Sequence, residues 1–234
     1  MSYPGGKAGA GVFQKIINQI PPHRIYIEPF LGSGAVMRNK KPAAASIGID
    51  IDAAVVEDWN NKYSQSGCIA IKGDAISFLK SYEWHGDEFV YCDPPYLFET
   101  RSCQRPIYTH EFGNKDDHIQ LLDVLNKLPC SVALSGYPSS LYKLMAPGWR
   151  TITYQTVNRA GKAVKEWLWM NYAEPMELHD YRYLGNNFRE RERLKRIKTR
   201  WVARLRRMEK LERYAVLSSI AEYSEMIMPS KASL

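Results

Sequence analysis

The 234-residue sequence has few cysteines and no long apolar segment. Its four cysteines, Cys68, Cys92, Cys103 and Cys130, lack the paired spacing of a zinc site. No stretch approaches the roughly 20 apolar residues that a membrane span requires, and the N-terminus lacks the apolar segment of a secretory signal. We therefore expect a cytoplasmic protein with reduced thiols, no metal and no membrane partner.

Negative charge is scarce in one region near the C-terminus. Residues 182–213 contain 13 Lys or Arg and 4 Glu, a net charge of +9, whereas the whole chain carries +7. The rest of the chain is therefore slightly acidic. A concentrated basic segment is typical of nucleic-acid contact, although a merely solvated helix face would have the same composition.

The basic segment also has a helical pattern. Apolar residues recur at intervals of three and four, at Leu194, Ile197, Trp201, Leu205, Met208 and Leu211. This spacing predicts one amphipathic helix that begins near Asn186 and ends before Pro229. We expect its apolar stripe to pack on the domain or on a second copy. On its basic face, Arg196, Arg200 and Arg207 are predicted to contact nucleic-acid phosphates.

The remaining sequence alternates between strand and helix patterns. Strands are predicted at 24–30, 46–50, 68–72, 88–92, 131–135, 150–155 and 167–172, and helices at 8–20, 53–64, 75–82, 115–128 and 138–145. Such alternation predicts an α/β fold with a mostly parallel sheet covered on both faces. The last two strands have no helix between them and should form an antiparallel hairpin. We predict a domain at residues 1–181 and an extension at 182–234.

The fourth strand ends in Asp93-Pro94-Pro95-Tyr96. Two prolines cannot continue a sheet, because they lack backbone donors and fix φ. A carboxylate, a free carbonyl at Pro94 and a flat ring at Tyr96 suit an exocyclic amino group on a planar base. The alternative is an Asp-Pro turn with a surface tyrosine, because short motifs match by chance.

Earlier strands end in residues that suit a nucleoside ligand. The first leads into a glycine loop, Leu31-Gly32-Ser33-Gly34, where glycine allows a tight turn and close approach of a ligand. The second ends at Asp50, which can hold a ribose diol. The third ends at Gly73-Asp74. Carboxyl ends of parallel strands share one rim of the sheet, so these features should lie together.

In this order, the motifs resemble the Dam-type DNA adenine-N6 methyltransferases, the α-ordered D12 class that uses S-adenosylmethionine. The resemblance covers roughly residues 1–175 and includes the N-terminal Tyr3-Pro4-Gly5-Gly6-Lys7 element. It implies a Rossmann-like seven-stranded methyltransferase sheet and catalysis by Asp93, Pro94, Pro95 and Tyr96. It also implies a cofactor site built from Tyr3, Pro4, Gly5, Gly6, Lys7, Pro29, Phe30, Gly32, Ser33, Gly34, Asp50, Ile51, Asp74, Ala75 and Asp93.

Some assignments compete with ordinary structural roles. Asp50 is preferred over Asp52 for the ribose, and Asp52 is expected to cap the helix that follows it. Asp74 could bond the adenine of the cofactor or cap a helix. Lys7 could be a solvated surface residue. His110 and His118 fit no catalytic or metal pattern, and we expect both at the surface.

The sequence departs from the family in one region. Only residues 75–92 separate Asp74 from Asp93, and one short helix, a turn and a strand account for them. No recognition domain fits there. The loop after Tyr96, with Arg101, Arg105, Tyr108 and Phe112, resembles the loop that lies beside a flipped base, although a solvated loop is the alternative.

These patterns predict a DNA adenine-N6 methyltransferase with relaxed or very short sequence specificity. It would act on a base flipped out of the duplex, with DNA as its partner and S-adenosylmethionine as its cofactor. The alternatives are an RNA base methyltransferase and a methyltransferase fold that binds nucleic acid without catalysis.

Overall fold

The computed structural model describes residues 7–9, 11–63, 67–101, 110–157 and 163–227. The chain divides into two compact units, residues 1–184 and 185–234. The predictions made for Tyr3, Pro4, Gly5, Gly6, Cys103, Arg105 and Tyr108 lie outside the described residues.

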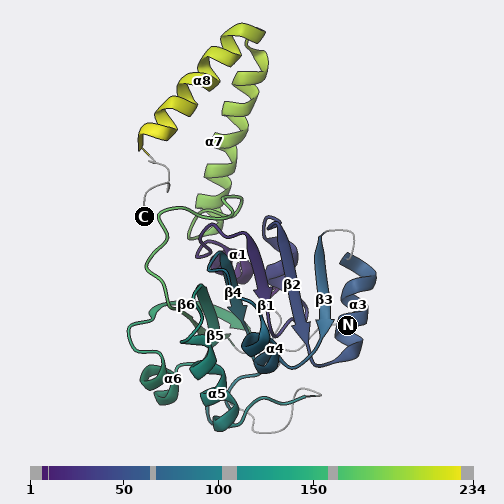
Figure 1. The fold of residues 1–234 in the computed structure, drawn as a ribbon. Coiled ribbons are helices and arrows are strands. Elements are labelled where there is room, and N and C mark those ends of the chain that lie inside the picture. The colour runs from purple at the N-terminus through teal and green to yellow at the C-terminus, as the bar shows by residue number, and fades with distance from the viewer. Residues whose placement is uncertain (1–6, 10, 64–66, 102–109, 158–162, 228–234) are drawn as a thin grey trace. The chain divides into compact units, whose positions relative to one another are not determined.

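The first unit is built around a seven-stranded sheet with the strand order β3-β2-β1-β4-β5-β7-β6 (Figure 1). Its strands are β1 (Ile25–Glu28), β2 (Ala45–Asp50), β3 (Cys68–Lys72), β4 (Glu88–Cys92), β5 (Ser131–Gly136), β6 (Arg150–Val157) and β7 (Ala163–Met170). Neighbours from β3 to β5 pair in parallel, whereas β7 runs antiparallel to both β5 and β6. The predicted seven-stranded, mostly parallel Rossmann-like sheet with a C-terminal antiparallel hairpin is confirmed.

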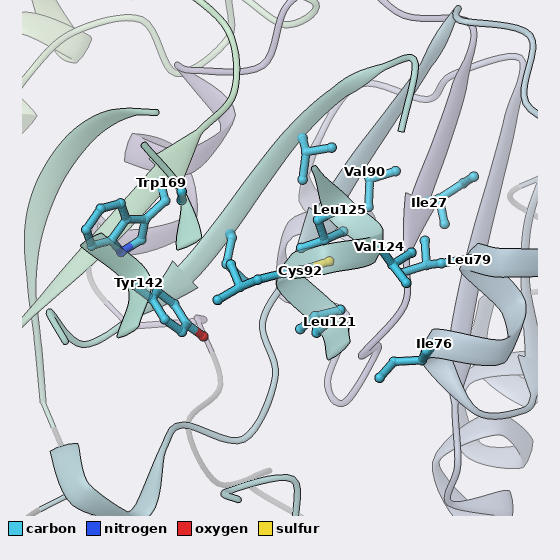
Figure 2. Packing of buried hydrophobic residues seen from close by; sticks show 14 of the residues in the cluster. Ile27, Ile76, Leu79, Val90, Cys92, Leu121, Val124, Leu125, Tyr142 and Trp169 are labelled. Carbon is cyan, nitrogen blue, oxygen red and sulfur yellow. The ribbon is translucent and has the colours of Figure 1, made fainter. Parts of the chain in front are cut away.

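Both faces of this sheet are covered by helices, because its central strands are apolar on both sides. The helices are α1 (Val12–Ile17), α2 (Ala35–Asn39), α3 (Ala53–Tyr63), α4 (Ala75–Ser81), α5 (Lys115–Leu125) and α6 (Ser140–Met145). On one face Phe89 and Tyr91 of β4 pack with side chains of α1, α2 and α3. On the other, Val90 and Cys92 join side chains of α4, α5 and α6 (Figure 2).

The strand order reverses between β1 and β4. The chain passes from β1 outward to β2 and β3, and then returns to place β4 on the other side of β1. Ligands of open α/β sheets bind at this reversal, outside the carboxyl ends of the strands. The glycine loop after β1 and the Asp93-Pro94-Pro95-Tyr96 turn after β4 both lie at that edge.

The second unit contains two helices, α7 (Phe188–Arg207) and α8 (Lys210–Ile227). The predicted start is confirmed, because Asn187 caps α7 by accepting a hydrogen bond of 3.0 Å from the Glu190 amide. The prediction of a single helix is wrong. Met208 has an extended backbone (φ −72°, ψ 149°), which ends α7. Among the described helices of the chain, none is long and apolar enough to cross a membrane.

Candidate active site at the end of strand β4

The charged cluster at the carboxyl end of β4 centres on Lys7. Its Nζ donates to Asp93 Oδ1 at 2.8 Å and to the Tyr96 hydroxyl at 2.8 Å, and lies 3.3 Å from Glu166 Oε2. The Lys7 side chain is only 4% exposed, so the alternative of a surface lysine does not hold. Burial lowers the pKa of Lys7, but the carboxylates of Asp93 and Glu166 outweigh that effect and raise it well above its usual range. Lys7 is therefore a fixed cation in the site.

The Tyr96 hydroxyl contacts the other three members of this cluster, Lys7, Asp93 and Glu166. It lies 2.8 Å from Glu166 Oε2 and 3.2 Å from Asp93 Oδ1. A hydroxyl has one proton, so the shorter contact assigns that proton to Glu166 while the oxygen accepts from Lys7. Burial, together with the nearby charges of Asp93 and Glu166, raises the pKa of Tyr96 well above its usual range, which keeps the phenol neutral.

Asp93 is held as an acceptor beside this cation. Burial raises its pKa; Lys7 opposes that shift, and the charge of Glu166 adds to it. A carboxylate paired with a fixed ammonium at 2.8 Å is a well-positioned hydrogen-bond acceptor. The arrangement suits the binding of an amino group and does not require Asp93 to remove its proton.

The backbone of the motif is anchored by a buried histidine. His118 of α5 lies 3.1 Å from the Pro95 carbonyl through Nε2 and 2.8 Å from the Tyr142 hydroxyl through Nδ1. A carbonyl only accepts, so Nε2 carries the proton and Nδ1 accepts from Tyr142. Burial lowers the pKa of His118 to about 4, which keeps the ring neutral.

The position of His118 corrects the sequence prediction. The residue was expected at the surface but is fully buried, because α5 packs on the sheet directly behind the motif. His110 is exposed, as predicted. Among the described residues, no donor reaches the buried Pro94 carbonyl.

Three hydroxyl groups from three different strands form a hydrogen-bonded chain. Tyr91 of β4 and Tyr154 of β6 each form a hydrogen bond with Ser135 of β5, at 2.9 and 3.0 Å. All three residues are buried. These hydrogen bonds connect side chains of β4, β5 and β6. A buried hydrogen-bonded network of this kind restricts side-chain movement.

The glycine loop closes over the end of β2. Gly32 and Gly34 both have positive φ, at 47° and 55°. The Gly32 amide donates to Asp50 Oδ2 at 2.8 Å, and the Asp52 amide donates to Asp50 Oδ1 at 2.9 Å. Asp50 therefore fixes the loop, while each oxygen keeps a lone pair for another donor. Burial raises the pKa of Asp50, and the two amides oppose that shift.

Other predicted cofactor residues line the same edge with different exposure. Asp52 accepts from the Ala54 amide at 2.9 Å, in agreement with a helix cap, and Asp74 caps α4 through the Ser77 amide at 2.8 Å. The Ile51 side chain is 48% exposed and is accessible to a ligand. Within the same edge, Pro29, Gly34 and Ala75 are buried, and Phe30, Gly32 and Ser33 are partly buried.

Two residues predicted to contact DNA, Arg101 and Phe112, make contacts within the first unit. Arg101 is 6% exposed, pairs with Glu111 at 2.9 Å and donates through Nε to the Tyr96 carbonyl at 2.6 Å. Phe112 packs edge-on against Phe30, with ring centroids 5.0 Å apart. Arg196, Arg200 and Arg207 are exposed on α7.

The structure adds three residues that the sequence patterns did not indicate. Glu166 enters the cluster from β7, and His118 supports it from α5. Tyr137, which follows β5, meets the Tyr96 ring edge-on with centroids 4.8 Å apart. The strand order could have indicated Tyr137, since β5 is the neighbour of β4. Across the described residues, no group of three metal-ligating side chains is present.

The fold is an open, mostly parallel α/β sheet, and the edge at which its strand order reverses combines a glycine loop with the Asp93-Pro94-Pro95-Tyr96 turn. Residues 71–152 match the model of the D12 class N6 adenine-specific DNA methyltransferase family. The match covers about a third of the chain and includes Asp74 and the turn from Asp93 to Tyr96. It supports methyl transfer as the class of reaction. No curated protein matches the chain.

Several solved methyltransferase structures resemble the chain at low sequence identity. A 23S rRNA methyltransferase, ErmE, has a TM-score of 0.48 and 13% identity, covering 75% of this chain and 72% of that one. A provisionally assigned methyltransferase from Escherichia coli has a TM-score of 0.47 and 17% identity, covering 73% and 90%. A dimethyladenosine transferase from Plasmodium falciparum has a TM-score of 0.45 and 16% identity, covering 70% and 62%.

Proposed function

We propose that the protein methylates the N6 amino group of adenine in DNA, with S-adenosylmethionine as the methyl donor. The observation that carries this proposal is the acceptor pair at the end of β4. Asp93 and Pro94 follow one another in the turn, the Tyr96 hydroxyl lies 3.2 Å from Asp93 Oδ1, and no donor to the Pro94 carbonyl is found among the described residues. Two acceptors and a ring match an exocyclic amino group on a planar base.

The chemistry follows from how these groups hold the amino nitrogen. The lone pair of adenine N6 is delocalised into the ring, so the nitrogen is a poor nucleophile. Hydrogen bonds from its two protons to Asp93 and Pro94 favour a more tetrahedral nitrogen whose lone pair points outward. Much of the rate would come from this positioning and from fixed charges. The proton can leave after transfer, so Asp93 does not need to be a strong base.

The residues at the ends of β1 and β2 fit the cofactor. The Asp50 carboxylate has lone pairs available for ribose hydroxyls, and the exposed Ile51 offers an apolar surface for an adenine ring. S-adenosylmethionine supplies a methyl group on a sulfonium, which needs no metal or acid to leave. The Gly32 and Gly34 turn allows the backbone to approach such a ligand closely.

DNA is proposed as the substrate because of the match at residues 71–152 and the basic helix α7. Phosphate contacts position a protein but do not read sequence. Residues 75–92 form only α4, a turn and β4, so no recognition domain is inserted before the motif. We therefore propose relaxed or very short sequence specificity.

The test is to incubate double-stranded DNA, single-stranded DNA and RNA separately with the protein and S-adenosylmethionine. Each sample is then digested to nucleosides and analysed by mass. N6-methyldeoxyadenosine in the DNA samples, absent with Asp93→Ala, is the expected result. Methylation confined to RNA would replace the DNA proposal with the RNA alternative. Undiminished product from Asp93→Ala would contradict the assigned chemistry.

A further inference from the structure

Glu166 is the one carboxylate of the cluster that comes from outside the β4 turn. It lies on β7 and pairs with Tyr154 of β6 in the sheet register. Its side chain is 6% exposed, and Oε2 lies 2.8 Å from the Tyr96 hydroxyl and 3.3 Å from Lys7 Nζ. A buried carboxylate placed against two groups of a candidate active site is costly unless its partners are fixed there.

The cluster contains one cation and two carboxylates. In the structure Lys7 lies closer to Asp93, at 2.8 Å, than to Glu166, at 3.3 Å. Lys7 and the Tyr96 hydroxyl both contact Oδ1 of Asp93, so an amino group that binds this oxygen competes with Lys7 for its lone pairs. Because Lys7 already touches both acids, a small displacement towards Glu166 would keep its charge paired while it releases Asp93.

The hydrogen bond that the Tyr96 hydroxyl donates also involves Glu166. Glu166 is its nearer acceptor, so Glu166 fixes the direction of the phenol oxygen and, with it, the ring. The Tyr96 oxygen in turn accepts from Lys7. Glu166 thus sets the positions of both neighbours of Asp93 without lying in the motif itself.

We propose that Glu166 is a positioning residue for methyl transfer: it receives the Lys7 ammonium when a substrate amino group binds Asp93, and it orients Tyr96. This inference rests on the proposed function. It describes how Asp93 becomes available to the substrate amino group when Lys7 moves towards Glu166. No covalent step is assigned to Glu166.

The test compares Glu166→Gln and Glu166→Ala with wild type in steady-state methylation of DNA. Glutamine keeps an acceptor for Tyr96 but removes the charge that attracts Lys7, whereas alanine removes both. We expect kcat to fall roughly 10- to 100-fold in both variants, as for a misplaced reacting group. The KM for S-adenosylmethionine should stay unchanged, and the KM for DNA should rise only in Glu166→Ala.

Glu88→Gln is the matched control. Glu88 is also a buried strand carboxylate, but it accepts from the His85 and Gly86 amides at the other end of β4. Its replacement should leave the kcat for methylation unchanged if the protein folds. Wild-type kcat in Glu166→Gln would overturn the proposal. An inactive wild type would instead refute the proposed function, and that outcome is visible in the same assay.

A second measurement does not depend on turnover. The charge of Glu166 disfavours ionisation of Asp93, so Glu166→Gln should move the NMR titration of the Asp93 carboxyl to lower pH. The titratable groups that face Asp93 are Lys7, Glu166, Glu28, Tyr26, Tyr91, Cys92, Tyr96, Tyr142 and Tyr154. The shift reports whether the charge of Glu166 acts on Asp93, and an unshifted midpoint overturns the proposal.

Discussion

Each residue of the β4 turn is fixed by a different part of the fold. Lys7 holds Asp93, His118 of α5 holds the Pro95 carbonyl, and Arg101 holds the Tyr96 carbonyl. No donor to the Pro94 carbonyl is found among the described residues. A turn held at three points cannot easily change conformation, so the acceptors are in place before any ligand binds.

The Tyr96 ring and its hydroxyl should contribute separately. Tyr96→Ala removes the stacking surface, which is worth roughly 1–3 kcal/mol per base, and should weaken binding of DNA that carries 2-aminopurine at the target adenine. Tyr96→Phe keeps the ring and loses the hydrogen bonds to Lys7 and Glu166. It should bind that DNA nearly as wild type does, with a lower kcat. Equal weakening of binding in both variants would show that the ring does not contact the base.

His118 should make the protein sensitive to acid. The pKa of its folded state is about 4 because the ring is buried, whereas the unfolded chain has the ordinary value near 6.5. Between these values the unfolded state binds more protons, so the free energy of unfolding decreases as the pH falls from about 6.5 to 4. At about 1.4 kcal/mol per pKa unit, the decrease is roughly 3 kcal/mol.

Replacement of His118 tests this contribution. His118→Phe should lower stability near pH 7 by about 1–3 kcal/mol, because the Pro95 carbonyl and the Tyr142 hydroxyl lose a buried partner. It should also flatten the dependence of stability between pH 4 and 6.5, measured by urea unfolding. The exposed His110 provides the control, and His110→Phe should leave the slope unchanged. An undiminished slope in His118→Phe would assign the acid sensitivity elsewhere, with the partly buried His23 the next candidate.

Among the elements, the turn from β1 to α2 leaves no space for a side chain at Gly34. Gly34 has a φ of 55°, and a Cβ at this position would overlap the Trp59 ring of α3. Gly34→Ala should therefore destabilise the protein by roughly 2–5 kcal/mol, combining backbone strain with overpacking. The measurement is the free energy of unfolding in denaturant.

Gly148→Ala is the matched control for that substitution. Gly148 also has a positive φ, of 78°, but no atom lies within 4 Å of a Cβ built there. Its replacement should cost only the backbone strain, about 1–2 kcal/mol. Equal destabilisation at Gly34 and Gly148 would show that α3 moves away to accommodate a methyl group.

The sequence patterns located most elements of the first unit. Strands such as β3 and β4 have the predicted bounds, because short apolar runs ended by Gly, Asp or Pro give a strong signal. The five-residue α2 was missed, since it is too short to show a period. The break between α7 and α8 was also missed. Residues 205–212 contain neither Gly nor Pro, and their apolar spacing continues through the break.

The candidate site was only partly predictable, because some of its residues lie outside any sequence motif. Residues of the turn and the glycine loop are adjacent in sequence and form recognisable motifs. Glu166 and His118 lie on elements with no motif and reach the site only through the pairing of β7 and the packing of α5. Their roles depend on contacts between distant segments, which single-sequence patterns do not show.

At the scale of the whole molecule, the two units differ in charge, and the basic excess lies in the second. Charge reversal of Arg196, Arg200 and Arg207 to Glu should weaken DNA binding and reduce its salt dependence. The slope of log K against log salt should fall by about 0.9 for each phosphate that the protein no longer neutralises. Fluorescence anisotropy at several salt concentrations measures this slope.

The control introduces the same change in charge on the first unit. Lys62, Lys80 and Lys143 are exposed on α3, α4 and α6. Their replacement by Glu changes the net charge equally and should have a smaller effect on the slope. Equal effects would mean that net charge, and not α7, determines binding. An unchanged slope after reversal on α7 would leave that helix without a phosphate role.

Sequence preference is a second property of the whole molecule. Because no recognition domain is inserted before the motif, we expect methylation at many adenines, with a bias from no more than one or two flanking bases. Methylation mapped by sequencing long DNA would measure this bias. Modification restricted to one fixed motif of four or more bases would contradict relaxed specificity.

The cluster around Lys7 also bears on biosynthesis. Lys7 precedes Tyr96 by 89 residues, and Glu166 follows Tyr96 by 70. A ribosome adds about 5–20 residues per second, so several seconds separate the appearance of the three side chains. A nascent chain that has completed the β4 turn still lacks β7, and its Lys7 and Asp93 have no third partner. Premature termination before Glu166 would therefore yield a chain with every recognisable motif and an incomplete charge cluster.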